Sequence, residues 1–289
     1  MSCMSQIDGV SFELREKHDF RWLHDVGKVF VVFDRQHSGN LCFGVETSSV
    51  KVFVKYAGAK TIEYKGEPQG AVSRLRQVVT VYRELRHPVL ARLLRTFETP
   101  RGFAAVFEWC EGECLMPETG IPPAEQKADL KSPYRRFRQL PISKRLDAFD
   151  ALLSFHVHVE AKGFVAIDFH DGNILYDFAT GEIKICDIDF YMKKPFINTV
   201  GTLWGSSRFM SPEEFEMGAS IDERTNVFNM GAIAFGLLGG EKNRAFSLWE
   251  AGQLLYNVAA RAVDRDKSKR YTSVADFATE WANRRSSQA

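Results

Sequence analysis

Three oxygen-bearing side chains lie near one another in the sequence, in a pattern that could hold a metal ion and activate a hydroxyl group. Asp168 and Asn173 are five residues apart in a polar loop before the apolar run 174–176, and Asp187 follows the apolar run 183–186. Two short apolar runs around a polar turn predict a hairpin. Strands set the direction of their side chains, so we expect the three groups to converge at one edge of a small sheet.

This set of groups suits phosphoryl transfer. Phosphoryl transfer needs one carboxylate that orients an attacking hydroxyl and accepts its proton, and an amide with a second carboxylate that hold Mg²⁺ against the phosphates. Asp and Asn in a loop are also common turn formers, and taken alone they predict only a turn. The presence of Asp187 at this distance downstream favours the catalytic interpretation.

These residues resemble the catalytic loop D-x-x-x-x-N and the following D-F-G of the protein-kinase-like family. Here the loop runs from Asp168 to Asn173, and Asp187-Ile188-Asp189 stands in the place of D-F-G. The string 205–213, G-S-S-R-F-M-S-P-E, resembles the end of a kinase activation segment. The resemblance covers roughly residues 22–281 and implies a divergent, bacterial member of the serine/threonine protein kinase family.

Two other residues of this half are implied by the resemblance to be structural. Asn226 stands in a helix motif where the family has an aspartate that anchors the backbone of the catalytic loop. An amide can still donate or accept a hydrogen bond there, without the assistance of a charge. Arg270 is implied to pair with Glu213, the glutamate of the P-E dipeptide.

The catalytic loop departs from the family at two positions. The usual H-R-D is 166–168, A-I-D, so the arginine that receives an activation-loop phosphate is missing, and we expect no regulation of that kind. His170 stands where protein kinases commonly have a lysine that touches the γ-phosphate, and kinases of the aminoglycoside type have D-x-H-x-x-N there. We predict that His170 is a catalytic residue. Asp189, in place of the D-F-G glycine, also resembles the small-molecule kinases.

The first half of the chain predicts a β-rich lobe. Apolar residues separated by polar turns predict three antiparallel strands, at 28–33, 41–45 and 50–56. The resemblance implies that the turn 34–40 covers the nucleotide phosphates, where kinases have a glycine-rich loop. Few glycines are present, so Ser38 and Gly39, with Asn40, are the predicted phosphate contacts. An ordinary hairpin turn has the same pattern.

Lys55 ends the string V-F-V-K and stands in the place of the family's V-A-I-K lysine. The resemblance implies contact with the α- and β-phosphates, whereas a lysine in an apolar strand is otherwise an outward-facing edge residue. Helical periodicity over 71–85 predicts a helix that ends before Pro88. Val78 occupies the position of the family's helix glutamate. Either Glu63 or Glu67 supplies this acid from the preceding loop, or the lysine–glutamate pair is absent.

The run 106–112 resembles a kinase hinge, where an extended backbone offers N–H and C=O groups to adenine. Phe107 is the implied gatekeeper, and Glu108 and Cys110 are the other predicted nucleotide contacts. We therefore expect an α+β protein with a two-lobe protein-kinase-like fold, a β-rich N-lobe and a mainly α-helical C-lobe. The expected division is 1–21 as an N-terminal extension, 22–110 as the N-lobe and 111–289 as the C-lobe.

Composition is that of an ordinary soluble globular protein. The 289 residues are 45% hydrophobic and 26% charged, with a net charge of +1. This balance predicts no binding to nucleic acid or membrane. The N-terminus has neither a secretory nor a transit pattern, so we expect a cytoplasmic protein.

The favoured function is that of an ATP-dependent serine/threonine protein kinase, with ATP and Mg²⁺ as cofactors and a protein substrate as partner. Two alternatives stay open. A small-molecule acceptor is suggested by His170 and Asp189. A pseudokinase, acting as a binding module, is suggested by the few glycines, by Val78 and by the missing arginine.

Overall fold

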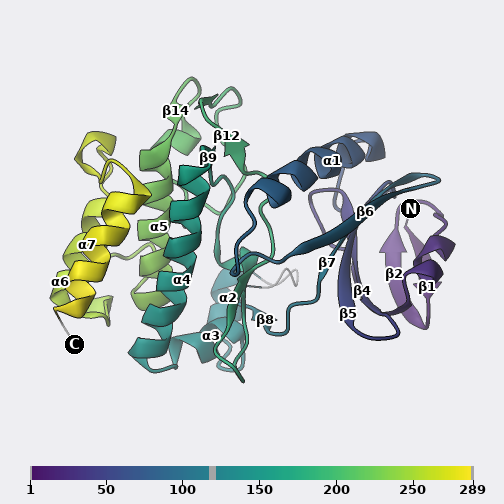
Figure 1. Cartoon of the computed structure of the whole chain (residues 1–289), viewed down its shortest axis with the longest axis horizontal. Coiled ribbons are helices and arrows are strands. Elements are labelled where there is room, and N and C mark those ends of the chain that lie inside the picture. The colour runs from purple at the N-terminus through teal and green to yellow at the C-terminus, as the bar shows by residue number, and fades with distance from the viewer. Residues whose placement is uncertain (1, 117–121, 288–289) are drawn as a thin grey trace. The chain divides into compact units, whose positions relative to one another are not determined.

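The computed structural model describes residues 2–116 and 122–287, and it divides the chain between Cys110 and Glu111 into two units. The elements of the first unit are β1 (Cys3–Ile7), β2 (Val10–Leu14), a 3-10 turn at Arg21–Asp25, β3 (Lys28–Phe33), β4 (Asn40–Glu46), β5 (Lys51–Ala57), α1 (Pro68–Glu84), β6 (Leu93–Thr99) and β7 (Gly102–Glu108). The predicted strands at 28–33, 41–45 and 50–56 are confirmed as β3, β4 and β5, of which β4 and β5 are labelled in Figure 1.

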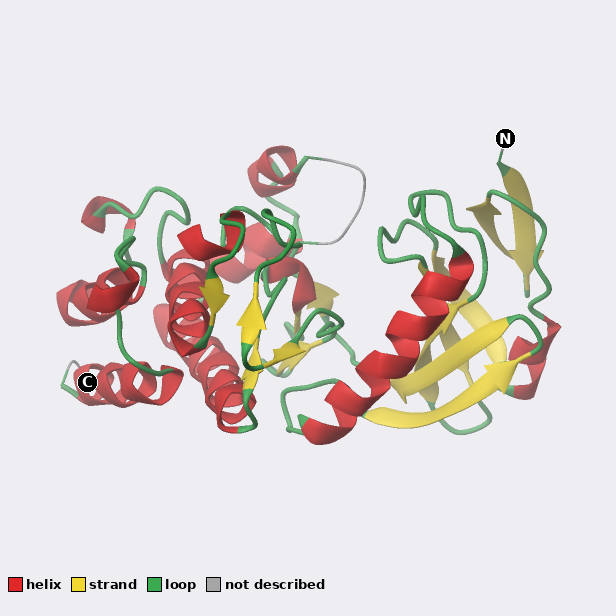
Figure 2. Ribbon diagram, turned by 90° about the horizontal axis from the view of Figure 1, so that it is seen from above, coloured by secondary structure: helices red, strands yellow, loops and turns green. Residues whose placement is uncertain are grey.

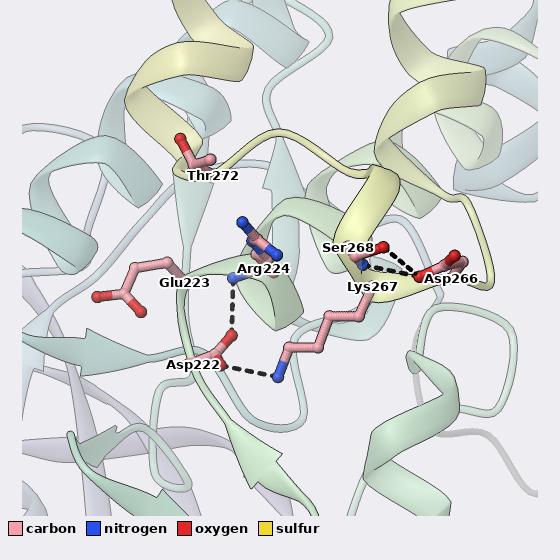
Figure 3. A pocket seen from close by; sticks show the side chains of 7 residues that line it. All are labelled: Asp222, Glu223, Arg224, Asp266, Lys267, Ser268 and Thr272. Atoms are coloured by element: carbon pink, nitrogen blue, oxygen red, sulfur yellow. Dashed lines mark hydrogen bonds and ion pairs between the residues drawn. The ribbon is translucent and has the colours of Figure 1, made fainter.

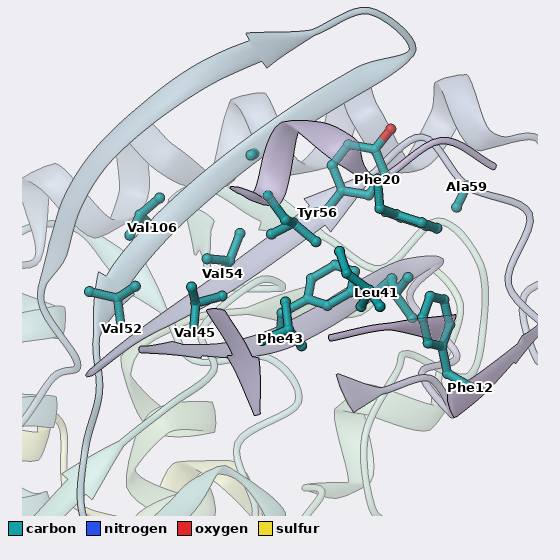
Figure 4. Packing of buried hydrophobic residues seen from close by; sticks show 14 of the residues in the cluster. Phe12, Phe20, Leu41, Phe43, Val45, Val52, Val54, Tyr56, Ala59 and Val106 are labelled. Carbon is teal, nitrogen blue, oxygen red and sulfur yellow. The ribbon is translucent and has the colours of Figure 1, made fainter. Parts of the chain in front are cut away.

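A five-stranded antiparallel sheet in the order β3-β4-β5-β7-β6 forms the centre of the first unit (Figure 2). Along each strand, successive side chains point to opposite faces of the sheet. In β5, Val54 and Tyr56 point into the core that Figure 4 shows, while Phe53 and Lys55 point to the other face. Helix α1 covers that other face, since its Tyr82 ring contacts Phe107 of β7 at a centroid distance of 4.7 Å.

The N-terminal residues belong to the same core. Strands β1 and β2 form a hairpin, and Phe12 on β2 and the following Phe20 pack edge-on against Phe43 of β4, with ring centroids 6.1 and 5.5 Å apart. Leu14 is fully buried. The segment 1–21, which the sequence-based division set apart as an extension, therefore supplies one wall of the β-rich unit.

Helix α1 begins three residues before the predicted start at 71. Pro68 occupies its first position, where the missing N–H has no partner inside the helix and the fixed φ suits helical geometry. Its buried face is apolar: Ala71, Val72, Leu75, Val78, Val79 and Tyr82. The helix ends at Glu84, before Pro88, as predicted.

The second unit is mainly helical. Its elements are β8 (Glu113–Cys114), α2 (Pro123–Ala128), α3 (Pro133–Arg138), α4 (Ile142–Ala161), β9 (Phe164–Val165), β10 (Ile174–Tyr176), β11 (Ile183–Ile185), β12 (Met192–Lys193), β13 (Phe196–Ile197), β14 (Ser220–Ile221), α5 (Glu223–Leu238), α6 (Gly252–Ala262) and α7 (Val274–Ser286). Short 3-10 turns lie at Asp171–Asn173, Pro212–Phe215, Phe246–Leu248 and Lys267–Lys269. Helix α5 is buried over nearly its whole length and packs against α4, α6 and α7. The two short helices α2 and α3 lie before α4 in the chain.

The predicted pair of Glu213 and Arg270 is confirmed, and it is buried. Arg270 donates through Nη1 to Oε1 of Glu213 at 2.7 Å and through Nη2 to Oε2 at 3.0 Å. Thr225 on α5 also donates to this carboxylate, at 2.8 Å. Burial would raise the pKa of Glu213, but the hydrogen bonds and charge of Arg270 hold it below the usual value.

We expect Arg270→Met to destabilise the second unit by about 3–5 kcal/mol, because it leaves the Glu213 carboxylate buried without its cation. Thermal unfolding monitored by circular dichroism measures this as a fall in Tm. Arg265→Met, at an exposed position five residues away, is the matched control and should leave Tm within about 1 °C. Equal Tm values for the two variants would contradict a stabilising role for the pair.

A second buried carboxylate, that of Glu214, makes stability depend on pH. Its Oε2 accepts from the Ser211 backbone N–H at 2.6 Å, the Ser211 hydroxyl at 2.8 Å and Asn229 at 3.0 Å. Burial raises the pKa of Glu214 to about 7, and these hydrogen bonds offset the burial only in part. The folded state therefore holds this proton more tightly than the unfolded state. That contribution is complete below the unfolded pKa and is lost as pH rises through about 7.

We expect Glu214→Gln, which keeps the shape without the titration, to be more stable than the wild type at pH 8 and to lose this advantage at pH 5. The difference between the two pH values should be on the order of 2–3 kcal/mol. Denaturant unfolding at both pH values measures it, with the exposed Glu216→Gln as control. Parallel pH profiles for wild type and Glu214→Gln would contradict this assignment.

Candidate active site

The predicted metal ligands lie at neighbouring strand ends in the second unit. Strands β10 and β11 pair with Ile174 opposite Ile185, and β8 pairs with the other edge of β10. The Cys186 N–H donates to the Asn173 carbonyl at 2.9 Å, so Asp187 directly follows a residue bonded to Asn173. The hairpin thus brings Asn173 and Asp187 to one edge of a three-stranded sheet.

Asp168 lies in the loop before this sheet, with a backbone conformation that needs support from its surroundings. Its φ is +66°, in the left-handed region that costs most side chains about 1 kcal/mol or more. The support comes from Asn226 on α5, which accepts from the Ala166 N–H at 2.8 Å and donates to the Phe164 carbonyl at 3.1 Å. The predicted anchoring of the catalytic loop by Asn226 is confirmed.

His170 connects the loop residues to one another. Its backbone N–H donates to Oδ1 of Asn173 at 2.8 Å, and its Nδ1 accepts the N–H of Gly172 at 2.9 Å. An Nδ1 that accepts carries no proton, so the ring proton lies on Nε2. Nε2 is 3.5 Å from Oδ1 of Asp168, and both side chains are about one quarter exposed. The histidine therefore presents an N–H group beside the predicted catalytic carboxylate, at a position that reaches solvent.

A glycine of the segment 205–213 and a buried tyrosine–histidine pair lie near the carboxylates. A Cβ built on Gly205, whose φ is +141°, would lie 3.5 Å from the Asp168 Cα, so the activation-segment string passes directly beside the catalytic loop. Below the loop, the Tyr191 hydroxyl and His156 Nε2 are 2.8 Å apart in a buried pair. Burial raises the pKa of Tyr191 well above its ordinary value, and the nearby charges of Asp168 and Asp187 act in the same direction.

The donor set fits a hard divalent cation. Carboxylate and amide oxygens are the ligands that Mg²⁺ prefers, and it commonly takes only one or two carboxylates from the protein, with phosphate oxygens and water completing its shell. Among residues 2–116 and 122–287, no group of three or more His, Cys, Asp or Glu side chains is arranged to hold a metal by itself.

In the first unit, Lys55 lies on β5, opposite Cys42 of β4 and Ala105 of β7. Only 4% of it is exposed, which is rare for a lysine and disfavours the alternative of an outward edge residue. It shares the α1 side of the sheet with Phe53 and Phe107, which are paired across β5 and β7. The predicted phosphate-contacting lysine and gatekeeper thus lie on one face.

Side chains support the turn 34–40 more than glycines do. Gly39 has a φ of +82°, and a Cβ there would lie 2.6 Å from the Tyr64 ring. Arg74 of α1 stacks over that ring at 5.1 Å and donates to the Ser38 carbonyl at 2.7 Å. The predicted phosphate-covering turn is therefore tied to α1 by Tyr64 and Arg74. No local pattern in the sequence points to Tyr64 or Arg74, because their partners Gly39 and Ser38 are 25 and 36 residues away.

The hinge-like run 106–112 begins in β7, which ends at Glu108. The Glu108 N–H donates to the Arg92 carbonyl at 2.9 Å, and the Glu108 carboxylate pairs with the Arg92 side chain at 3.3 Å. Cys110 is the last residue of the first unit. Lys55, Ser38, Gly39, Phe107, Glu108 and Cys110 thus belong to the first unit, while Asp168, His170, Asn173 and Asp187 belong to the second.

The buried face of α1 carries no acid in the place of the helix glutamate that the resemblance implied. Val78, at the expected position, is 4% exposed and lies among apolar residues. Glu67 is the N-cap residue of the helix, and its side chain makes no capping hydrogen bond. The Glu63 carboxylate lies 3.5 Å from the Arg35 guanidinium.

A hollow on the second unit, shown in Figure 3, lies away from these residues. It is lined by charged and polar residues: Asp222, Glu223, Arg224, Asp266, Lys267, Ser268 and Thr272. Lys267 pairs with Asp222 at 2.8 Å, and Asp266 accepts from Ser268. These mutual contacts are structural, and the hollow contains none of the predicted site residues.

Comparison with known proteins agrees with this geometry. Residues 43–250, more than half of the chain, match the family described as protein kinase domain. The chain therefore belongs to the protein kinase family. The predicted α+β kinase fold, with a β-rich N-terminal part and a helical C-terminal part, is confirmed. The predicted resemblance to the serine/threonine protein kinases is also confirmed.

Similar proteins include three serine/threonine-protein kinases. TIO from Arabidopsis thaliana is 23% identical over 214 residues, which cover 72% of this chain and 14% of that protein. Unc-51 from Caenorhabditis elegans is 24% identical over 250 residues, which cover 82% of this chain and 25% of that protein. Serine/threonine-protein kinase 36 from Pongo abelii is 25% identical over 193 residues, which cover 66% of this chain and 13% of that protein. The chain thus spans a quarter or less of the length of these relatives.

Proposed function

We propose that this chain transfers the γ-phosphate of ATP to a serine or threonine hydroxyl of a protein. The observation that carries the proposal is the placement of Asp168, Asn173 and Asp187 in one loop and at the neighbouring ends of β10 and β11. Asp168 orients the acceptor hydroxyl and takes up its proton. His170 donates from Nε2 to the transferred phosphate, and Lys55 holds the α- and β-phosphates. Positioning and charge neutralisation supply most of the rate acceleration.

Asn173 and Asp187 are the proposed Mg²⁺ ligands, and the ion when bound neutralises charge on the phosphates. In the first unit, the proposed nucleotide contacts are Ser38 and Gly39 at the phosphates and Phe107, Glu108 and Cys110 at the adenine. Binding of ATP is implied by the family, and these individual contacts are proposals.

A protein acceptor is favoured by the segment 205–213, which matches the family's activation-segment end and lies beside Asp168 through Gly205. His170 and Asp189 favour a small-molecule acceptor, and the apolar face of α1 around Val78 favours a pseudokinase that only binds. No helix in the described parts of the chain has both the length and the apolar composition to cross a membrane. A cytoplasmic location and a bacterial origin remain predictions.

The test is incubation of the purified protein with labelled ATP and Mg²⁺, together with a generic protein acceptor and a panel of small hydroxyl and amino compounds. Label on serine or threonine of the protein acceptor supports the proposal. Label on a small compound alone transfers the assignment to a small-molecule kinase. Nucleotide binding without any label transfer identifies a pseudokinase.

A further inference from the structure

A buried ion pair holds the middle of the catalytic loop. Asp171 opens the 3-10 turn Asp171–Asn173, and Arg208 of the activation-segment string binds it with both guanidinium nitrogens, at 2.5 Å from Nη1 to Oδ2 and 2.6 Å from Nη2 to Oδ1. The exposed fractions of the two side chains are 3% and 14%. A two-pronged contact of this kind fixes direction as well as distance.

The pair is one part of a longer row of alternating charges. Nη1 of Arg208 also donates to Oε1 of Glu241 at 3.1 Å, and Oε2 of Glu241 pairs with Lys127 of α2. The Lys127 ammonium lies over the Tyr134 ring at 4.7 Å. At the other end, Asp171 directly follows His170 in the catalytic loop. The row therefore runs from the small helix α2 to the catalytic loop, entirely within the second unit.

The position of Asp171 makes its partner important for its neighbours. It stands directly after His170 and two residues before Asn173, in a turn of only three residues. Asp171 is buried, and both of its carboxylate oxygens accept from the Arg208 guanidinium, which balances the charge of the carboxylate. A buried charge that loses its cation is strongly disfavoured and draws in water or moves. A turn this short cannot move Asp171 without moving the groups on either side.

We propose that Arg208 is a positioning residue, which acts through Asp171 to hold His170 and Asn173 in the orientation that the catalytic loop needs. The effect of this orientation on catalysis rests on the proposed function. The effect of Arg208 on the conformation of the loop does not depend on that function. Removal of Arg208 should have the largest effect on the loop, loss of the Glu241 charge a smaller one and loss of the Lys127 charge the smallest, because each lies one contact further from Asp171.

The test compares Arg208→Met, Arg208→Lys, Asp171→Asn and the double variant Asp171→Asn/Arg208→Met with the wild type. Arg136→Met, which removes an exposed pair with Glu113 in the same unit, is the matched control. The first readout is hydrogen exchange of the backbone amides at 166–174 in the nucleotide-free protein. The second is kcat and KM for ATP, measured well below each variant's Tm.

We expect Arg208→Met to raise exchange in 166–174 and to lower kcat on the order of 10- to 100-fold, with KM for ATP within about 2-fold, as misplacement of a catalytic group predicts. The double variant should be no worse than the more impaired single variant, because both changes remove one interaction. Arg208→Lys should be intermediate, since a lysine makes only one of the two contacts. Arg136→Met should match the wild type.

Unchanged exchange in 166–174 for Arg208→Met would overturn the proposal, whether or not the protein transfers phosphate. Additive losses in the double variant would also overturn it, because they would mean that the two residues act separately. If the wild type transfers no phosphate, the proposed function fails, and the exchange measurement alone then decides whether the pair holds the loop.

Discussion

Asp187→Asn abolishes the thermal stabilisation that the protein gains from ATP with Mg²⁺. Wild-type protein at a nucleotide concentration 100 times its Kd should gain about 2.7 kcal/mol, a shift of several degrees in Tm. Asp187 follows β11 beside Asn173, and its carboxylate is the charged member of the proposed pair of ligands. An amide keeps the size of this group but loses the charge that attracts the cation, so the variant should show no shift.

The matched control for this experiment is Asp177→Asn, the same change at the exposed turn of the same hairpin. It should keep the full nucleotide-dependent shift. Shifts of equal size in Asp187→Asn and the wild type would mean that the metal ligands are wrongly assigned, while the loss of the shift in both variants would point to damage to the hairpin.

Asp168→Asn removes turnover and leaves nucleotide binding intact. An amide can accept a hydrogen bond from the acceptor hydroxyl but cannot take its proton, so kcat should fall by about 10²- to 10⁴-fold. The left-handed backbone at this position, with a φ of +66°, is one that Asn tolerates well, so the fold should not suffer. Steady-state kinetics and nucleotide-dependent Tm shifts on the same protein measure the two effects separately.

Asp177→Asn again serves as the control, with kcat within about 2-fold of the wild type. If Asp168→Asn turned over at the wild-type rate, Asp168 would have no role in the chemistry. If it also lost nucleotide binding, Asp168 would act in binding rather than in activating the acceptor.

Much of the fold could be predicted because its signals are local. The strands β3 to β5, helix α1 and the hairpin of β10 and β11 each show their periodicity within about 20 residues, and Pro88 marks where α1 must stop. The candidate catalytic residues could also be proposed from the sequence. Asp168, Asn173 and Asp187 all lie within a span of 19 residues, in a loop and a hairpin whose strands pair over a short range.

Contacts between distant residues were predicted only where a family string pointed to both partners. Glu213 and Arg270 are 57 residues apart, and their pair was implied by the resemblance to kinases, not by any spacing. Asp171 and Arg208 are 37 residues apart, and no string linked them. Residues 1–21 were set apart as an N-terminal extension, and their packing of Phe12 and Phe20 against Phe43 joins residues more than 20 positions apart.

Sequence by itself determined the strands β3 to β5, helix α1 and the hairpin of β10 and β11, and it supplied the candidate catalytic side chains, because hydrophobic periodicity and the choice of Asp, Asn and Lys are properties of single short stretches. Only the tertiary structure decided which groups hold those side chains in place: Asn226 on the loop backbone, Arg208 on Asp171, and Tyr64 with Arg74 on the turn 34–40. These supports depend on where the folded backbone brings distant residues together, which no local pattern of residues contains.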